Sequence, residues 1–392
     1  MSILFLYLYN ISSDMKKRLK IGLFLASDPS KAGGIQAFVS NVSKELALLQ
    51  QDVVVFGPQV SHPHVYEFPS YVPVSKSLFL NFPSGFQPRV NLPLLNTSDY
   101  KLDILHIHEP YVPFVTGKLP FTKHATVKIA GFHTGWRSTG LWVNTVTATL
   151  PHLKHLYHHY YDGVTYASSF VRKNWHVLFE STVSEKIIRY GIRPPKVLGQ
   201  KSSNGKVNVV FLARLVPRKG VIDFLQAIHL LNPKVFQKIE VTIIGDGPER
   251  KIAEMFAQEN IHLRKVKFTG ELVGEDRLSH LATCDVFVAP YRDEGFGLTI
   301  FEALSNGCAI TGYMNEVFKD TLDGYPEPSL FVSQGNLKAL SKNIEQLVSD
   351  KKLREKLSTW GIVQSKKYSW RTVAEQTLQF YRDILESKGI SG

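Results

Sequence analysis

The chain has 392 residues, of which 44% are hydrophobic, so it is long enough for two domains with ordinary soluble cores. Its formal net charge of +12 favours anionic partners such as phosphates or anionic lipid headgroups. No zinc-ligand spacing, RNP-type aromatic motif or long arginine run is present, and we therefore expect no nucleic-acid partner. The only cysteines, Cys284 and Cys308, form no metal or redox motif, which favours a reducing compartment.

The first half of the chain alternates strand-like and helix-like segments. Residues 1–14 are expected to be a flexible extension, because their apolar run is too short to span a bilayer and lacks the features of a signal peptide. Residues 15–193 are expected to form an N-terminal domain, in which residues 57–98, rich in Pro, Ser and aromatics, are mostly loop. Its strands are predicted at 19–25, 52–56, 103–109, 127–132 and 162–167.

Several of these strands end in residues that could bind a ligand. Gly33 and Gly34 follow the first strand and open a helix, where glycines let the backbone approach a diphosphate; a tight turn with positive φ is the alternative. His133 follows the strand at 127–132, and it either bonds a ligand or is structural. His106 and His108 lie on one side of a strand and could share a metal ion, but no third ligand is indicated, so we expect no metal.

A second alternation follows a Pro-, Ser- and Gly-rich linker at 194–206. It defines a C-terminal domain over 207–371, and a last helix over 372–392 is expected to cross back to the N-terminal domain. Its strands are predicted at 207–212, 240–244, 266–269, 285–290 and 309–311. The predicted fold class is α/β, with two Rossmann-like parallel-sheet domains facing across a cleft and ligands at the carboxyl ends of the strands.

Two strand ends of the C-terminal domain carry groups suited to a nucleotide. Arg214 and Lys219 follow the strand at 207–212, and two cations there suit a diphosphate, although solvated surface charges are the alternative. Gly245 and Gly247 bracket the turn after the strand at 240–244 and are expected to shape the loop beside a nucleotide.

Two carboxylates, Glu294 and Glu302, stand eight positions apart around a Gly-Phe-Gly turn. A predicted helix over 298–305 begins directly after the turn, so its first backbone N–H groups form a natural anion site. The residues that would offer these N–H groups are Gly295, Phe296, Gly297 and Leu298. A solvated helix face is the alternative reading of the two glutamates.

The segment 294–303 resembles the Glu-x7-Glu signature of the retaining glycosyltransferases of family 4 type, whose fold is called GT-B. Residues 211–220 are similar to the Gly-Arg-Leu-x-x-x-Lys-Gly segment of that family, with Ala213 in place of the first glycine. Across 20–381 the chain looks most like the phosphatidylinositol mannosyltransferases, including the strand end at 106–110. It departs from the family at 188–193, where Ile-Arg-Tyr-Gly-Ile-Arg replaces the common Ile-Pro-Asn-Gly-Val-Asp.

The resemblance implies transfer of a mannose- or glucose-type hexose from a GDP- or UDP-linked donor, with retention and without a metal or further cofactor. Arg214 and Lys219 would stabilise the leaving diphosphate, Glu294 and His133 would bind the transferred sugar, and Glu302 would hold the ribose. The remaining donor-site residues would be Gly33, Gly34, Gly245, Gly247, Gly295, Phe296, Gly297 and Leu298.

The expected acceptor is a lipid or lipid-linked sugar, with the enzyme peripheral at the cytoplasmic face of the cell membrane and an anionic membrane surface as a partner. Apolar and basic residues suggest such a surface, ordinary core contacts being the alternative. They are Lys76, Leu78, Phe79, Leu80, Phe82, Phe86 and Arg89, with Lys118, Lys123, His124 and Lys128 as a second group. A soluble sugar or polysaccharide acceptor, or a non-catalytic nucleotide-sugar-binding subunit, remains the alternative.

Overall fold

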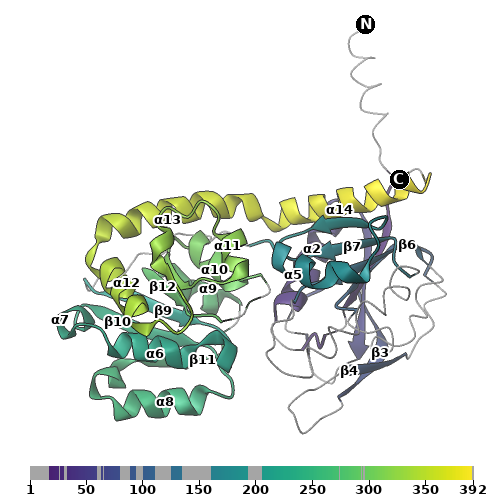
Figure 1. The fold of residues 1–392 in the computed structure, drawn as a ribbon. Helices are drawn as coiled ribbons and strands as arrows, with labels where there is room; N and C mark the ends of the chain where they lie inside the picture. The colour runs from purple at the N-terminus through teal and green to yellow at the C-terminus, as the bar shows by residue number, and fades with distance from the viewer. Residues whose placement is uncertain are drawn as a thin grey trace, which may run out of the picture.

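The computed structural model has two α/β lobes side by side, each built on one sheet (Figure 1). The structure describes residues 17–25, 27–30, 33–59, 63–64, 66–79, 89–93, 100–110, 125–134, 160–192, 205–272, 274–292, 294 and 296–390. The predicted extension and most of the predicted linker lie outside these ranges. Within the described residues, no helix combines the length and apolar character needed to cross a bilayer.

The N-terminal lobe contains an eight-stranded sheet in the order β4-β3-β2-β1-β5-β6-β7-β8. All neighbouring strands pair in parallel except β3 and β4, which are antiparallel. The strands are β1 (Lys20–Leu25), β2 (Asp52–Gln59), β3 (Tyr71–Phe79), β4 (Arg89–Pro93), β5 (Leu102–His108), β6 (Ala125–Phe132), β7 (Gly163–Tyr166) and β8 (Ser184–Ile187).

The C-terminal lobe contains a six-stranded, wholly parallel sheet in the order β11-β10-β9-β12-β13-β14. The strands are β9 (Val207–Leu212), β10 (Ile239–Ile244), β11 (Lys267–Gly270), β12 (Val286–Ala289), β13 (Ala309–Tyr313) and β14 (Phe331–Val332). Their side chains are largely buried because helices cover a parallel sheet on both faces. The predicted α/β class with two parallel-sheet domains is therefore confirmed.

The described helices cover these sheets (Figure 1). They are α2 (Gly34–Leu48), α5 (Ser169–Trp175), α6 (Val221–His229), α7 (Pro233–Phe236), α8 (Arg250–Glu259), α9 (Gly274–Ala282), α10 (Leu298–Ser305), α11 (Glu316–Thr321), α12 (Leu337–Ser349), α13 (Lys351–Ser365) and α14 (Trp370–Ser387). Short 3₁₀ helices span His176–Leu178 (η4), Pro217–Lys219 (η5), Ile261–Lys265 (η6), Pro328–Leu330 (η7) and Lys366–Tyr368 (η8).

Each sheet has one point at which the strand order reverses. From β1 the chain builds outward through β2 and β3, and it then returns to β5 on the other side of β1. The second sheet does the same at β9 and β12. Ligands of open parallel sheets bind outside the carboxyl ends of the strands at such a switch point. The loops that follow β1, β5, β9 and β12 are therefore the places where each lobe is built to bind.

Helix α14 is the longest of the described helices and lies against the N-terminal lobe, although α13 directly before it covers the C-terminal lobe (Figure 1). The Tyr381 hydroxyl lies 2.8 Å from His106 Nδ1 of β5. At the start of α14, Ile192 forms a parallel bridge with Ser369, and the Ile192 N–H donates to the Tyr368 carbonyl oxygen at 2.7 Å. The end of the chain thus joins the two lobes.

The expectation that residues 57–98 are mostly loop was wrong for part of that segment. Strand β2 continues to Gln59, and β3 and β4 lie within the remainder. Proline and serine suggested a loop, but β3 obtains its backbone hydrogen bonds by pairing with β2 on one side and β4 on the other. Pairing between distant segments decides the structure here, because local composition only weakly determines a strand.

Gly191 should be intolerant of a side chain, because the chain crosses α14 closely there. A Cβ at Gly191 would lie 2.5 Å from Trp370 Cδ2 and 2.7 Å from Trp370 Cα. We expect Gly191→Ala to lower the free energy of unfolding by about 1–3 kcal/mol, the usual cost of overpacking. Chemical denaturation measures this change, and an unaltered midpoint and slope would show that the crossing is looser than described.

Candidate active site

The predicted site residues lie at the carboxyl ends of strands, and most of them flank the two switch points. Gly33 and Gly34 follow β1, whereas Lys219 follows β9 and Glu294 follows β12. His133 follows β6, the second strand beyond the switch point of the N-terminal sheet. Gly295 lies outside the described residues, so its predicted role stays a prediction.

The loops after β9 and β12 are held against each other by backbone contacts. The Arg292 N–H donates to the Arg218 carbonyl oxygen at 2.9 Å. Gly220 has φ 69°, and a Cβ there would overlap the Pro290 carbonyl oxygen, so only glycine fits. The Arg292 guanidinium bonds both carboxylate oxygens of Asp223 at 2.9 Å. The spacing between Lys219 and Glu294 is therefore fixed by the surrounding fold.

Lys219 and Glu294 form an ion pair between Nζ and Oε2. The Lys219 ammonium also lies 4.5 Å from the centroid of the Tyr291 ring, where the negative face of the ring attracts a cation. Lys219 is only 9% exposed. A buried ammonium held in this way can exchange its carboxylate partner for an anionic ligand at little structural cost, because its position does not depend on that partner alone.

Glu302 lies in the second turn of α10 and is buried. Arg277 of α9 binds its Oε1 at 2.6 Å. Burial raises the pKa of the Glu302 carboxyl, while Arg277 acts in the opposite direction. Its Oε2 is buried and has no hydrogen-bond partner within the described part of the chain. An oxygen of this kind can accept a hydrogen bond from a ligand hydroxyl.

Gly245 and Gly247 are required by backbone packing. Their φ angles are 138° and 155°, and a Cβ at either position would overlap a carbonyl oxygen, that of Ala213 or of Leu215. The Leu215 N–H donates to the Asp246 carbonyl oxygen at 2.9 Å. The turn after β10 thus supports the loop that carries Arg214, whose side chain is exposed.

The glycines at the other predicted loops differ from one another. Gly297 has φ 86° and precedes the first residue of α10, Leu298, so it turns the chain into the helix. Neither Gly33 nor Gly34 has a positive φ, so the tight-turn alternative does not hold for this pair. A Cβ at Gly34 would lie 3.5 Å from Cε1 of Tyr190, so the start of α2 lies against that ring.

His133 is buried, and both of its ring nitrogens are engaged within the protein. Its Nε2 lies 2.8 Å from His108 Nδ1, and its Nδ1 lies 2.9 Å from the Tyr190 hydroxyl. Burial lowers the pKa of His133 to about 3, so the ring is neutral at pH 7. A sugar could be bonded by this ring only if one of these two hydrogen bonds were exchanged.

The other groups at the end of β5 also bind within the protein. His106 meets the Tyr381 hydroxyl through Nδ1 and Thr165 Oγ1 through Nε2, at 2.8 and 3.0 Å. No group of three or more His, Cys, Asp or Glu in the described ranges could hold a metal ion. Glu109 has a left-handed backbone, with φ 60°, and its Oε1 accepts the His133 N–H at 2.9 Å. Burial raises the pKa of Glu109 to about 8.

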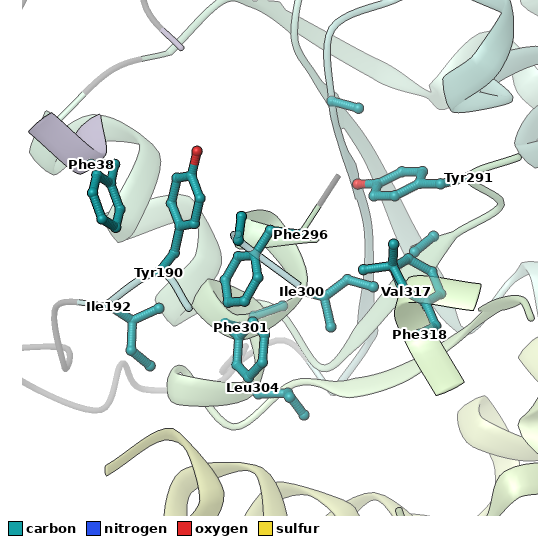
Figure 2. Close-up of a cluster of buried hydrophobic side chains, with 14 of the residues drawn as sticks. Phe38, Tyr190, Ile192, Tyr291, Phe296, Ile300, Phe301, Leu304, Val317 and Phe318 are labelled. Atoms are coloured by element: carbon teal, nitrogen blue, oxygen red, sulfur yellow. The ribbon is translucent and has the colours of Figure 1, made fainter. Parts of the chain in front are cut away.

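Tyr190 connects the two lobes. Its ring stacks on Phe296 of the loop after β12, with centroids 4.9 Å apart and ring planes 19° apart (Figure 2). Phe38 of α2 packs on the other side of this cluster, 5.1 Å from the Tyr190 ring and 4.8 Å from the His133 ring. The contact brings the histidines of the N-terminal lobe close to the loop that carries Glu294.

Sequence reasoning missed four residues of this arrangement: Tyr190, Tyr291, Arg277 and Glu109 as a buried carboxyl. Tyr190 was noted only as a departure from the family pattern, and that departure was the available signal. Tyr291 directly follows an apolar strand, which could have drawn attention to it. Arg277 gives no signal, because it resembles any surface arginine of a polar helix.

Only part of the surface expected to face an acceptor membrane lies within the described residues. Lys128 lies in β6 and is half-buried, with its N–H bonded to Asp162 Oδ2 at 2.8 Å. Lys76, Leu78 and Phe79 belong to β3 and Arg89 belongs to β4. The remaining residues of both predicted groups lie outside the described residues. The membrane-facing surface therefore stays a prediction.

Comparison with known proteins places both halves of the chain in glycosyltransferase families. Residues 32–192 match Glycosyltransferase Family 4, and residues 199–362 match Glycosyl transferases group 1. A phosphatidyl-myo-inositol mannosyltransferase of Mycobacterium leprae is 25% identical over 94% of this chain and 98% of that protein. A phosphatidylinositol N-acetylglucosaminyltransferase subunit of Saccharomyces cerevisiae is 24% identical over 90% of this chain and 80% of its own.

Solved structures share the fold. A sucrose-phosphate synthase from Thermosynechococcus elongatus superimposes with a TM-score of 0.72 at 18% identity, covering 94% of this chain and all of that one. Anabaena HepE in complex with UDP and glucose gives a TM-score of 0.66 at 14% identity, covering 92% of this chain and 99% of that one. These likenesses confirm the two-lobed GT-B architecture.

The buried Glu109 should make stability depend on pH. In the folded state the Glu109 carboxyl keeps its proton until the pH approaches about 8, whereas in the unfolded chain it loses the proton near pH 4.5. The free energy of unfolding therefore falls as the pH rises between these two values. The slope approaches about 1.4 kcal/mol per pH unit. We expect the free energy of unfolding of the wild type to fall by about 2 kcal/mol between pH 6 and pH 8 because of Glu109, and Glu109→Gln to lack this fall. Urea denaturation at both pH values tests this, and parallel pH curves would contradict it.

Proposed function

We propose that this chain, which belongs to the GT-B glycosyltransferases with family 4 and group 1 domains, transfers a mannose- or glucose-type hexose from a nucleoside diphosphate sugar with retention. The observation that carries the proposal is the ion pair between the buried Lys219 and the half-buried Glu294, beside the switch point of β9 and β12. A preformed ammonium next to a carboxylate suits a ligand with a diphosphate and a hydroxyl-rich sugar.

In the proposed complex, Lys219 and Arg214 bind the donor diphosphate. The Lys219 ammonium leaves Glu294 for the phosphate, and the exposed Arg214 side chain contacts it from the outside. Backbone N–H groups of Gly297 and Leu298 at the start of α10 add further donors. Gly33 and Gly34, whose helix begins at the other switch point, approach the diphosphate or sugar from the N-terminal lobe.

The two glutamates take different parts of the donor. Glu294, once released by Lys219, accepts hydrogen bonds from hydroxyls of the transferred sugar. Glu302 is already held by Arg277 through Oε1, and its unpaired Oε2 accepts from a ribose hydroxyl. We assign the ribose to Glu302 because Arg277 already fixes its carboxylate, and the transferred sugar to Glu294 because its carboxylate must leave Lys219 to bind a ligand.

We propose a front-face reaction. The bond from the anomeric carbon to the diphosphate breaks, and the acceptor oxygen joins the same face of the sugar. The acceptor proton passes to the leaving diphosphate oxygen. Lys219 and Arg214 stabilise the negative charge that grows on the diphosphate, and so no bound metal or further cofactor is needed in this scheme. A double displacement would need a free carboxylate nucleophile, whereas Glu294 is committed to Lys219 and then to sugar hydroxyls.

The proposed acceptor is a lipid or lipid-linked sugar at the cytoplasmic membrane face. The net charge of +12 and the named substrates of the two relatives, both phosphatidylinositol compounds, support this choice. A polysaccharide acceptor is the second candidate, because an O-antigen chain mannosyltransferase of Escherichia coli is 27% identical over 178 residues. Incubation with membrane-lipid extracts and with soluble glycans separates the two.

Replacing either member of the ion pair should abolish most transfer. We expect Lys219→Ala and Glu294→Ala each to lower kcat by about 100-fold or more, the usual effect of removing one charge-stabilising group. Radiolabelled sugar transfer measures this loss. Arg218→Ala is the matched control, because this neighbouring cation is exposed and should be dispensable. Near-normal turnover in a folded Lys219 or Glu294 variant would contradict the proposed role of this ion pair.

The stereochemistry of the product tests the front-face reaction. The anomeric configuration of the donor should be kept, and proton NMR of the product gives it directly through the coupling constant of the anomeric proton. The rate should be unchanged when a chelator is added. An inverted product, or loss of turnover with chelator, would require a different mechanism.

A further inference from the structure

We propose that Tyr190 is a positioning residue, whose hydroxyl orients the His133 ring and whose own ring holds the donor loop through Phe296. This inference rests on the proposed function, because it concerns how the two lobes are aligned for transfer. One side chain would then set a group of the N-terminal lobe and a loop of the C-terminal lobe relative to each other.

The contacts of Tyr190 reach both lobes. Its hydroxyl lies 2.9 Å from His133 Nδ1, and its ring stacks on Phe296 with centroids 4.9 Å apart. Only 3% of Tyr190 is exposed. Figure 2 shows its ring between Phe38 on one side and Phe296 on the other. Because a phenol ring is rigid, moving Phe296 would also move the hydroxyl away from His133.

The hydroxyl determines how the two neighbouring histidines share their protons. Burial lowers the pKa of both His108 and His133, so both rings are neutral and one must donate to the other. If Tyr190 donates to His133 Nδ1, His133 donates through Nε2 to His108. If Tyr190 accepts from Nδ1, His108 donates to His133, and the Tyr190 hydroxyl hydrogen is free to bond elsewhere.

Loss of the hydroxyl would leave His133 Nδ1 buried without its partner. His108 Nε2 is already buried without a hydrogen-bond partner in the described part of the chain. The histidine pair would then contain two unpaired buried ring nitrogens. Burial, with Glu109 and Glu294 nearby, raises the pKa of Tyr190 well above its usual range, and the hydroxyl therefore keeps its hydrogen. Without it, the ring orientation and tautomer of His133 are no longer fixed.

The stack has a separate effect on the donor loop. Phe296 lies two residues after Glu294 and directly before Gly297, and it also stacks on Phe301 of α10 at 4.9 Å. A change at Tyr190 that removes the ring would therefore loosen the loop carrying Glu294. A change that removes only the hydroxyl would leave this loop in place. The two effects can be separated by choosing the substitution.

The kinetic test compares Tyr190→Phe with Tyr190→Leu. Tyr190→Phe keeps the stack, and we expect kcat to fall about tenfold with a smaller change in the donor KM. The loop that carries Glu294 stays in place, whereas His133, which is expected to bind the transferred sugar, loses its orienting hydrogen bond. Tyr190→Leu should also raise the donor KM. Tyr381→Phe is the matched control, since it removes another buried tyrosine hydroxyl, 2.8 Å from His106 Nδ1. It should leave kcat unchanged.

A double-mutant cycle identifies His133 as the group through which the hydroxyl acts. In a His133→Ala background, Tyr190→Phe should cause no further loss of kcat. An unchanged kcat in Tyr190→Phe, an equal loss in Tyr381→Phe, or a full additional loss in the His133→Ala background would each overturn the proposal.

The ring nitrogens of His133 give a readout that needs no turnover. Nitrogen-15 NMR of labelled histidines should show a changed His133 signal in Tyr190→Phe and an unchanged one in Tyr381→Phe. If the wild-type chain transferred no sugar from any donor, the proposed function would fail, while this measurement would still decide whether Tyr190 orients His133. An identical His133 signal in wild type and Tyr190→Phe would overturn the positioning role.

Discussion

The stack of Tyr190 on Phe296 is the contact on which the arrangement of the site depends. Each parallel sheet places its ligand-binding loops at the carboxyl ends of its strands, and the groups of the proposed donor site come from both lobes. The stack joins the loops at the strand ends of the two lobes, with His133 in the N-terminal lobe and the loop of Glu294 in the C-terminal lobe. Helix α14 supports the same junction through the bridge between Ile192 and Ser369.

The Lys219–Glu294 pair shows how such a site can be stable before its ligand arrives. A buried charge without a partner is costly, so the ammonium and carboxylate neutralise each other, and the Tyr291 ring adds attraction for the cation. In the proposed complex the pair separates, because the donor diphosphate binds the ammonium and the sugar hydroxyls bind the carboxylate. Glu302 differs, since Arg277 occupies only one of its oxygens.

Much of this could be predicted from the sequence, because apolar runs such as Val207–Leu212 form buried parallel strands and polar groups follow them. The positions of Lys219 and Glu294 after strands, and of Glu302 within a helix, followed from local pattern alone. The partners did not, because Arg277 and Tyr190 reach the site only through tertiary packing. The hydrogen bonds of His133 were hidden for the same reason, and β3 was missed because pairing with distant strands overrides its loop-like composition.

Nucleotide binding to the loops after β9 and β12 can be measured by thermal unfolding. Thermal unfolding of the wild-type chain and of Lys219→Ala should be followed with GDP, UDP, ADP and their sugar conjugates, without added metal. We expect one nucleotide series to raise the unfolding temperature of the wild type, as any ligand specific to the native state must, and Lys219→Ala to lose most of this rise. Unchanged unfolding with every nucleotide, or an equal rise in the variant, would contradict a donor site built on Lys219.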